Sequence, residues 1–176
     1  VFDVAQTDPI EGKAQPLDGP SAQLLDGEAP AGLQEALEAQ VAAAGFTFER
    51  GTPASPGANG TTTWATRRVI VRDDVSDAQA AKTSVHELAH ILLGHEHTDA
   101  TRARGEVEAE SVAYVVAGYA GLDTSSYSLG YVAGWAESGK EAEAVRETAE
   151  RVLTVAGQIV AGLDGEEEAD ATAEAA

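Results

Sequence analysis

The 176-residue sequence contains no cysteine and no methionine, and only 5% of its residues are aromatic. The lack of cysteine excludes disulfide bonds, thiolate metal ligands and a cysteine nucleophile, and it is compatible with a reducing, cytoplasmic compartment. Because aromatic residues are scarce, the core must consist mainly of alanine, valine and leucine. Since even position 1 is not methionine, we expect a domain taken from a longer polypeptide.

Long apolar runs are also missing. No stretch approaches the roughly 18 residues that a membrane span requires. The first residues, VFDVAQTDPI, lack the basic and then apolar pattern of a signal peptide. We therefore expect no membrane association and a cytoplasmic location.

Basic residues are few, and the net charge is −19. The excess of acidic residues lies in the two terminal parts of the chain. The net charge is −7 over residues 1–45, 0 over residues 46–105 and −12 over residues 106–176. The ordinary reason for such an excess of acid is solubility. Because nucleic-acid affinity rests mainly on lysine and arginine contacts to phosphates, we expect no direct nucleic-acid binding by this segment.

The pattern along the chain predicts three parts. Residues 1–29, with proline and glycine among acids, are typical of a flexible linker, and residues 164–176 of a disordered acidic tail. Between them, apolar periodicity predicts helices over 30–45, 76–94, 105–120, 129–138 and 140–163. Alternation predicts a strand over 46–50, and 61–74 is typical of two short strands or one bent strand. We therefore expect an α+β domain over 30–163, with a small sheet packed against several helices.

All four histidines lie within residues 86–97, in the sequence HELAHILLGHEH. His86 and His90 are four residues apart, so on a helix both imidazoles leave the same face one turn apart. A separate apolar stripe, which includes Val85 and Leu88, can dock to the core. This is the H-E-x-x-H pattern, in which two neutral imidazoles bind Zn²⁺ and the glutamate, here Glu87, polarises the metal-bound water. The alternative is a pair of partly exposed helix histidines without a ligand.

A zinc site with an open position needs a third protein ligand. The nearest candidates along the chain are His95, His97 and Asp99. The extended pattern H-E-x-x-H-x-x-G-x-x-H would require glycine at position 93 and histidine at position 96, and the chain has Leu93 and Glu96 there. We therefore expect His95 and His97 to be surface or loop residues, which could line the cleft.

The following helix offers another third ligand. Glu106 and Glu110 are four residues apart and share one face, whereas Glu108 is about 200° away from Glu106 and cannot join them. We interpret Glu106 as the third ligand and Glu110 as the acceptor of a histidine N–H, which is a usual means of fixing a ligating imidazole. The alternative is that both acids stand in the first turn of a helix because its dipole favours them there.

The segments HELAHILLGH and RGEVEAESVAYVVAG together resemble the gluzincin metallopeptidases. They are most similar to the ImmA/IrrE-type metallo-endopeptidases and to the zincin-like domain of ArdC-type antirestriction proteins. In the second group, VFDVAQT resembles the end of the single-stranded-DNA-binding domain that precedes the peptidase. LDTSSYSLGYVAGWA resembles the Y-x-x-x-W segment after the glutamate helix. The resemblance covers roughly residues 60–136.

The resemblance implies a zincin-like fold and zinc-dependent hydrolysis of a protein or peptide substrate, in a mobile-element or antirestriction setting. His86, His90 and Glu106 would be the zinc ligands and Glu87 the catalytic base. Any DNA contact would belong to the preceding domain.

A second electrophile is usual at such sites, and Tyr127, Tyr131 and Tyr119 are the candidates, among which the sequence does not choose. A competing hypothesis is a zinc-stabilised protein-binding module whose peptidase activity is vestigial or gated by a partner.

Overall fold

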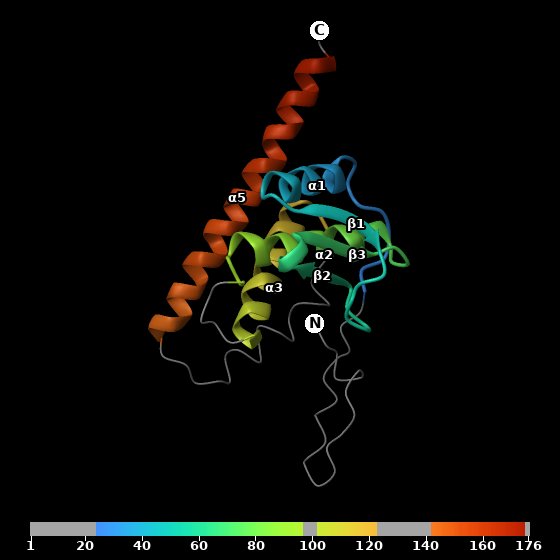
Figure 1. The fold of residues 1–176 in the computed structure, drawn as a ribbon. Coiled ribbons are helices and arrows are strands. Elements are labelled where there is room, and N and C mark those ends of the chain that lie inside the picture. The colour runs from blue at the N-terminus through green and yellow to red at the C-terminus, as the bar shows by residue number, and fades with distance from the viewer. Residues whose placement is uncertain (1–23, 97–101, 123–141, 175–176) are drawn as a thin grey trace.

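The computed structural model describes residues 24–96, 102–122 and 142–174 (Figure 1). The elements are α1 (Leu33–Ala43), β1 (Thr47–Gly51), β2 (Gly60–Thr63), the 3-10 turn η2 (Trp64–Thr66), β3 (Arg68–Arg72), α2 (Asp77–Leu92), α3 (Arg102–Tyr119) and α5 (Ala142–Glu174). Within these residues the protein is α+β, with one small sheet beside several helices, as the sequence predicts.

The sheet has three strands in the order β1-β3-β2. The central strand β3 pairs in parallel with β1 and antiparallel with β2. Val69 and Val71 of β3 are fully buried, because alternate side chains of a strand point to the same face. Residues 61–74 therefore form two strands rather than one bent strand. They are joined by η2 and by Arg67, whose positive φ of 48° helps to reverse the chain.

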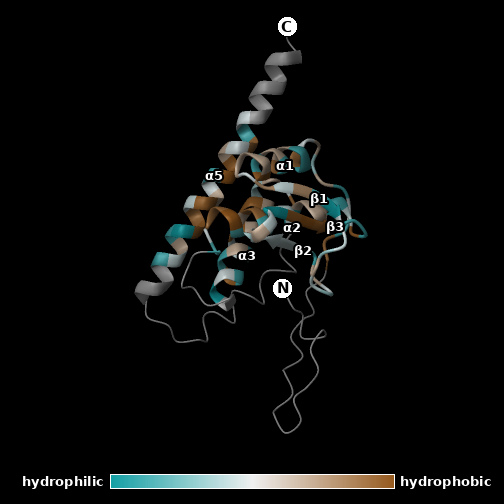
Figure 2. Ribbon diagram, in the orientation of Figure 1, coloured by the Kyte–Doolittle hydropathy of each residue, from teal (hydrophilic) through white to brown (hydrophobic). Residues whose placement is uncertain are grey.

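Helix α2 lies at the centre of the molecule and contacts β2, β3, α1, α3 and α5 (Figure 1). Its predicted apolar stripe is buried, with Val85 at 2% and Leu88 and Ala89 at 0% exposure. Figure 2 shows hydrophobic residues on the faces that the sheet and the helices turn toward one another. The core consists mainly of alanine, valine and leucine, as the composition predicts.

The start of α2 is capped by a local sequence signal. The Ser76 hydroxyl accepts a hydrogen bond from the Gln79 backbone N–H at 3.2 Å, which satisfies one unpaired donor of the first turn. The backbone N–H of Leu25 donates to the Gln79 side chain at 2.9 Å, and Leu25 is buried. Leu25 therefore packs against the start of α2.

The bounds of two helices differ from those expected. Helix α3 begins at Arg102 instead of residue 105, so Glu106 and Glu110 do not lie in its first turn, and the helix dipole does not explain them. Helix α5 continues beyond Leu163 to Glu174, because the expected tail is rich in alanine and glutamate, which favour helix. The helix predicted over 129–138 lies outside the described residues. Every helix among the described residues is too short or too polar to cross a bilayer.

Candidate metal centre

Two imidazoles leave the same face of α2, as the i, i+4 spacing predicts. The Nε2 atoms of His86 and His90 are 3.1 Å apart, and the ring centroids are 4.8 Å apart. The opposite face of the helix is packed in the core, so the orientation of both rings is set by the burial of Val85 and Leu88. The helix therefore aims two ring nitrogens at a common point.

Glu106 reaches the same point from the second turn of α3. Its Oε2 lies 3.5 Å from Nε2 of His86 and 3.8 Å from Nε2 of His90. A point about 2.0 Å from all three atoms exists in their plane, which matches the zinc–nitrogen and zinc–carboxylate bond lengths of about 2.0–2.2 Å. Two helices thus bring together a set of ligand atoms that could hold a metal ion.

The groups of this site shift one another's pKa values. Burial lowers the pKa of His86, but hydrogen bonds to Glu106 and Glu110 outweigh burial and raise that pKa to about 9. Burial raises the pKa of the Glu106 carboxyl, but its contacts with His86 and His90 outweigh burial and hold the pKa far below its usual range. A cation bound here would compete with the proton of the imidazole.

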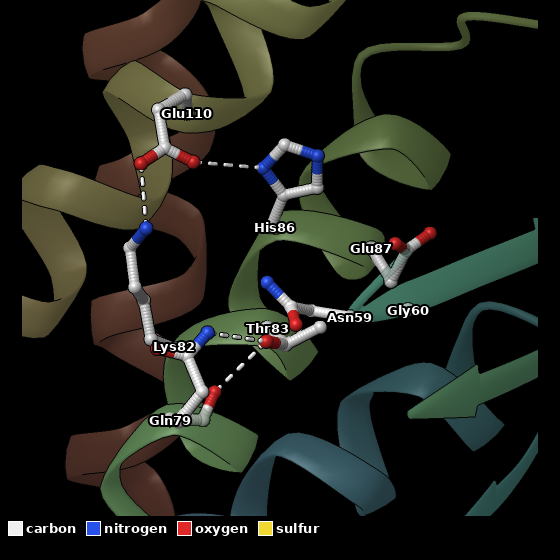
Figure 3. A pocket seen from close by; sticks show the side chains of 8 residues that line it. All are labelled: Asn59, Gly60, Gln79, Lys82, Thr83, His86, Glu87 and Glu110. Carbon is white, nitrogen blue, oxygen red and sulfur yellow. Dashed lines mark hydrogen bonds and ion pairs between the residues drawn. The ribbon is translucent and has the colours of Figure 1, made fainter. Parts of the chain in front are cut away.

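Glu110 lies on the other side of the His86 ring. Nδ1 of His86 is 3.1 Å from Oε2 of Glu110, and Nζ of Lys82 donates to Oε1 at 2.6 Å (Figure 3). The predicted contact with a histidine N–H is therefore present. Burial raises the pKa of Glu110, but the His86 hydrogen bond and the charge of Lys82 outweigh it and lower the pKa to about 2. An ionised Glu110 can only accept, so it orients Nε2 of His86 toward Glu106.

Glu87 turns toward the sheet rather than toward α3. Its Oε2 accepts a hydrogen bond from the Thr62 hydroxyl of β2 at 2.7 Å. A Cβ at Gly60 would lie 2.8 Å from Oε1 of Glu87 and 2.7 Å from Cγ2 of Thr83. Glycine is thus required for β2 to approach α2 this closely.

A small cavity lies between β2, α2 and α3 beside Glu87 (Figure 3). His86, Glu87 and Glu110 line it together with Lys82 and Asn59. Its volume is about 20 Å³, enough for one water molecule. The cavity therefore offers space for a small polar molecule between a potential metal ligand and a carboxylate.

His95 lies in the turn after α2, which fits the expected surface or loop residue only in part, because its side chain is not at the surface. Its side chain is 8% exposed, its Nδ1 is 2.7 Å from Nδ1 of His90, and its Nε2 is 3.0 Å from Oε2 of Glu108. Burial lowers the pKa of His95 despite its hydrogen bond to Glu108. The sequence did not reveal this burial, because it depends on how the chain turns back at Gly94, which has a φ of 70°, and brings His95 against His90. His97 and Asp99 lie outside the described residues.

Of the three tyrosine candidates, Tyr119 lies within the described residues, and it is far from the site. Tyr119 is 57% exposed and its hydroxyl donates to Asp164 at 2.6 Å. It stands thirteen residues after Glu106 on the same helix, about 20 Å along the axis, so it is wrong as a second electrophile. Tyr127 and Tyr131 lie outside the described residues.

Sequence reasoning missed three side chains that contact the site residues. Lys82 is four residues before His86, so its helical spacing was a usable signal for a shared face. Thr62 and Glu108 carried no comparable signal. As predicted, Glu108 does not join Glu106, but it is buried against His95, Arg104 and Arg151 instead.

Comparisons with known proteins add little detail. No family model matches the chain, and no solved structure matches it. Over 99 residues, the chain is 26% identical to the uncharacterized protein pXO2-81 of Bacillus anthracis, a match that covers 55% of this chain and 17% of that protein. The chain thus corresponds to a small part of that relative. The functional assignment therefore rests on the chemistry of the site.

Proposed function

We propose that this chain is a zinc-dependent metallo-endopeptidase domain of the gluzincin type, with a zincin-like core. The observation that carries the proposal is the convergence of His86, His90 and Glu106 from two helices. Their ligand atoms lie 3.1–3.8 Å from one another, which leaves room for an ion at zinc bond lengths from all three. Two imidazoles and one carboxylate are a ligand set that zinc favours, and they leave a position for water or substrate. When bound, the ion lowers the pKa of water and polarises a carbonyl group.

Glu87 is the proposed general base. It lies next to His86 on α2 and lines the cavity that has room for water. Its carboxylate accepts the proton from the attacking water and then donates that proton to the departing amine nitrogen. The Thr62 hydroxyl holds one of its oxygens, which limits the carboxylate to one orientation.

Strand β2 supports a peptide as the substrate. It is at one edge of the three-stranded sheet and lies against Glu87 through Gly60 and Thr62. An extended peptide can add to such an edge through main-chain hydrogen bonds, which would bring its carbonyl groups past the site. The sequence resemblance supports a mobile-element or antirestriction setting for this activity.

A zinc-stabilised protein-binding module is the second candidate. The observation that favours it is the burial of His86 and Glu87, which are only 7% and 6% exposed. A site this enclosed suits a structural ion, or a peptidase that opens only when a partner binds. Both candidates bind zinc, so turnover discriminates between them.

The test combines metal analysis with cleavage of an unfolded protein and a mixed peptide library. His86→Ala should lose zinc and cleavage together, whereas Glu87→Gln should keep zinc and lose cleavage. Glu35→Gln, an exposed glutamate on α1, is the matched control and should change neither. Cleavage by Glu87→Gln at the parent rate would refute the role of Glu87, and zinc without any cleavage by the parent would favour the binding module.

A further inference from the structure

A second line of polar contacts supports the other histidine of the site. Nδ1 of His90 faces Nδ1 of His95 at 2.7 Å, and Nε2 of His95 faces Oε2 of Glu108 at 3.0 Å. Two imidazole nitrogens at this distance need one proton between them, since otherwise two lone pairs would face each other. The contact therefore restricts where the protons of both rings lie.

Only one arrangement satisfies all the contacts when Nε2 of His90 binds a metal. His90 is then neutral, carries its proton on Nδ1 and donates to Nδ1 of His95. His95 must accept there, so its own proton lies on Nε2 and is donated to Glu108. The carboxylate of Glu108 ends the line as an acceptor, and Arg104 at 2.9 Å and Arg151 at 3.5 Å favour its ionised form.

The backbone hydrogen bonds at the end of α2 place His95 in this position. After α2 ends, the N–H of Gly94 donates to the carbonyl of Ile91 at 3.0 Å, and the N–H of His95 donates to the carbonyl of His90 at 3.1 Å. These two bonds are a Schellman motif, in which the second residue after the cap folds back over the last turn. That position usually carries an apolar contact, but here it carries the imidazole pair.

Helices α5 and α3 also stabilise the position of His95. Arg151 of α5 donates to the carbonyl of Leu93 at 2.9 Å, which satisfies an open carbonyl at the end of α2. The Glu108 side chain is only 1% exposed and comes from α3. The His95 side chain is thus held between three helices.

We propose that His95 is a positioning residue for His90, with Glu108 as the fixed end of a His90–His95–Glu108 relay. The proposal rests on the metal site of the proposed function. The two histidine ligands then differ in the group that holds their Nδ1 atoms. Nδ1 of His86 contacts the carboxylate of Glu110 directly, whereas Nδ1 of His90 contacts the neutral imidazole of His95. The relay holds the ring of His90 so that Nε2 faces Nε2 of His86 and Oε2 of Glu106.

Zinc affinity, measured by competition with a chromophoric chelator, tests the relay without any need for peptidase activity. His95→Ala should weaken zinc binding by about 10–100-fold, the usual effect of removing a group that orients a ligand. His95→Asn should recover most of that loss, because its amide oxygen can occupy the place of Nδ1 and accept from His90. Glu108→Leu, which removes the acceptor for Nε2 of His95, should weaken binding, whereas Glu150→Leu, exposed on α5, is the matched control and should not.

Nitrogen-15 NMR of the histidine rings in the zinc-loaded protein gives the second readout. We expect His90 to carry its proton on Nδ1 and His95 to carry its proton on Nε2. Unchanged affinity in His95→Ala, or a proton on Nδ1 of His95, would overturn the relay. Complete loss of zinc in both His95 variants would also overturn it, because His95 would then be a ligand. If the parent protein binds no zinc, the metal site and the relay both fail, whereas zinc binding without peptide cleavage removes only the peptidase activity.

Discussion

The buried ion pair between Lys82 and Glu110 leads to a quantitative prediction. The two side chains are 3% and 4% exposed, and Nζ lies 2.6 Å from Oε1. Lys82→Met removes the ammonium and leaves a buried carboxylate whose remaining donor among these contacts is His86. Removing one partner of a buried pair costs about 3–5 kcal/mol, and since the His86 contact persists, we expect about 3 kcal/mol.

A double variant separates the charge effect from the loss of packing. In Lys82→Met with Glu110→Gln, no unpaired charge is left, and the amide oxygen of glutamine can still accept from His86. We therefore expect the double variant to recover most of the free energy of unfolding that Lys82→Met loses. The exposed pair of Arg68 and Glu49, at 45% and 50% exposure, is the matched comparison. Arg68→Met should cost less than about 1 kcal/mol.

Urea unfolding followed by circular dichroism measures these differences. A chelator must be present, because bound zinc would add its own contribution to the free energy of unfolding. With a urea dependence of about 2 kcal/mol/M, a loss of about 3 kcal/mol lowers the midpoint by about 1.5 M. The reasoning is refuted if Lys82→Met costs no more than Arg68→Met, or if the double variant is as unstable as Lys82→Met.

Three further predictions concern the ligand, the base and the turn after α2. Glu106→Ala should retain far less zinc than the parent after dialysis, because one of three ligands is lost; metal analysis showing an undiminished content would contradict this. Gly60→Ala should lower peptide hydrolysis about 10–100-fold with zinc content unchanged, because the new Cβ would displace Glu87 or lift β2. Gly94→Ala should cost about 1–2 kcal/mol in thermal unfolding because of its positive φ. Gly118→Ala, within α3 and with open space around it, should instead stabilise the protein by about 1 kcal/mol.

Local rules explain which parts of the site the sequence predicted. The spacing of His86 and His90 places both rings on one face of any helix, whatever that helix packs against. The same rule pairs Glu106 with Glu110, and the Ser76 cap marks the start of α2. These features depend on contacts within about one helical turn, so neighbouring residues are enough to determine them.

These local rules do not predict side-chain contacts between different helices and strands. Lys82 and Glu110 are 28 residues apart, and their pairing depends on how α2 and α3 pack against each other. The contact of Thr62 with Glu87 depends on the approach of β2 to α2 at Gly60.

The sequence alone therefore determined the histidine helix, its buried stripe and the facing pair of glutamates, because helix periodicity is a property of the local backbone. Only the tertiary structure decided which groups hold the ligands. The sequence placed His95 in a loop or at the surface, and the turn at Gly94 brings it between His90 and Glu108. The reason is physical: the direction of a chain after a turn, and the partner of a buried charge, depend on the packing of segments that are distant in sequence.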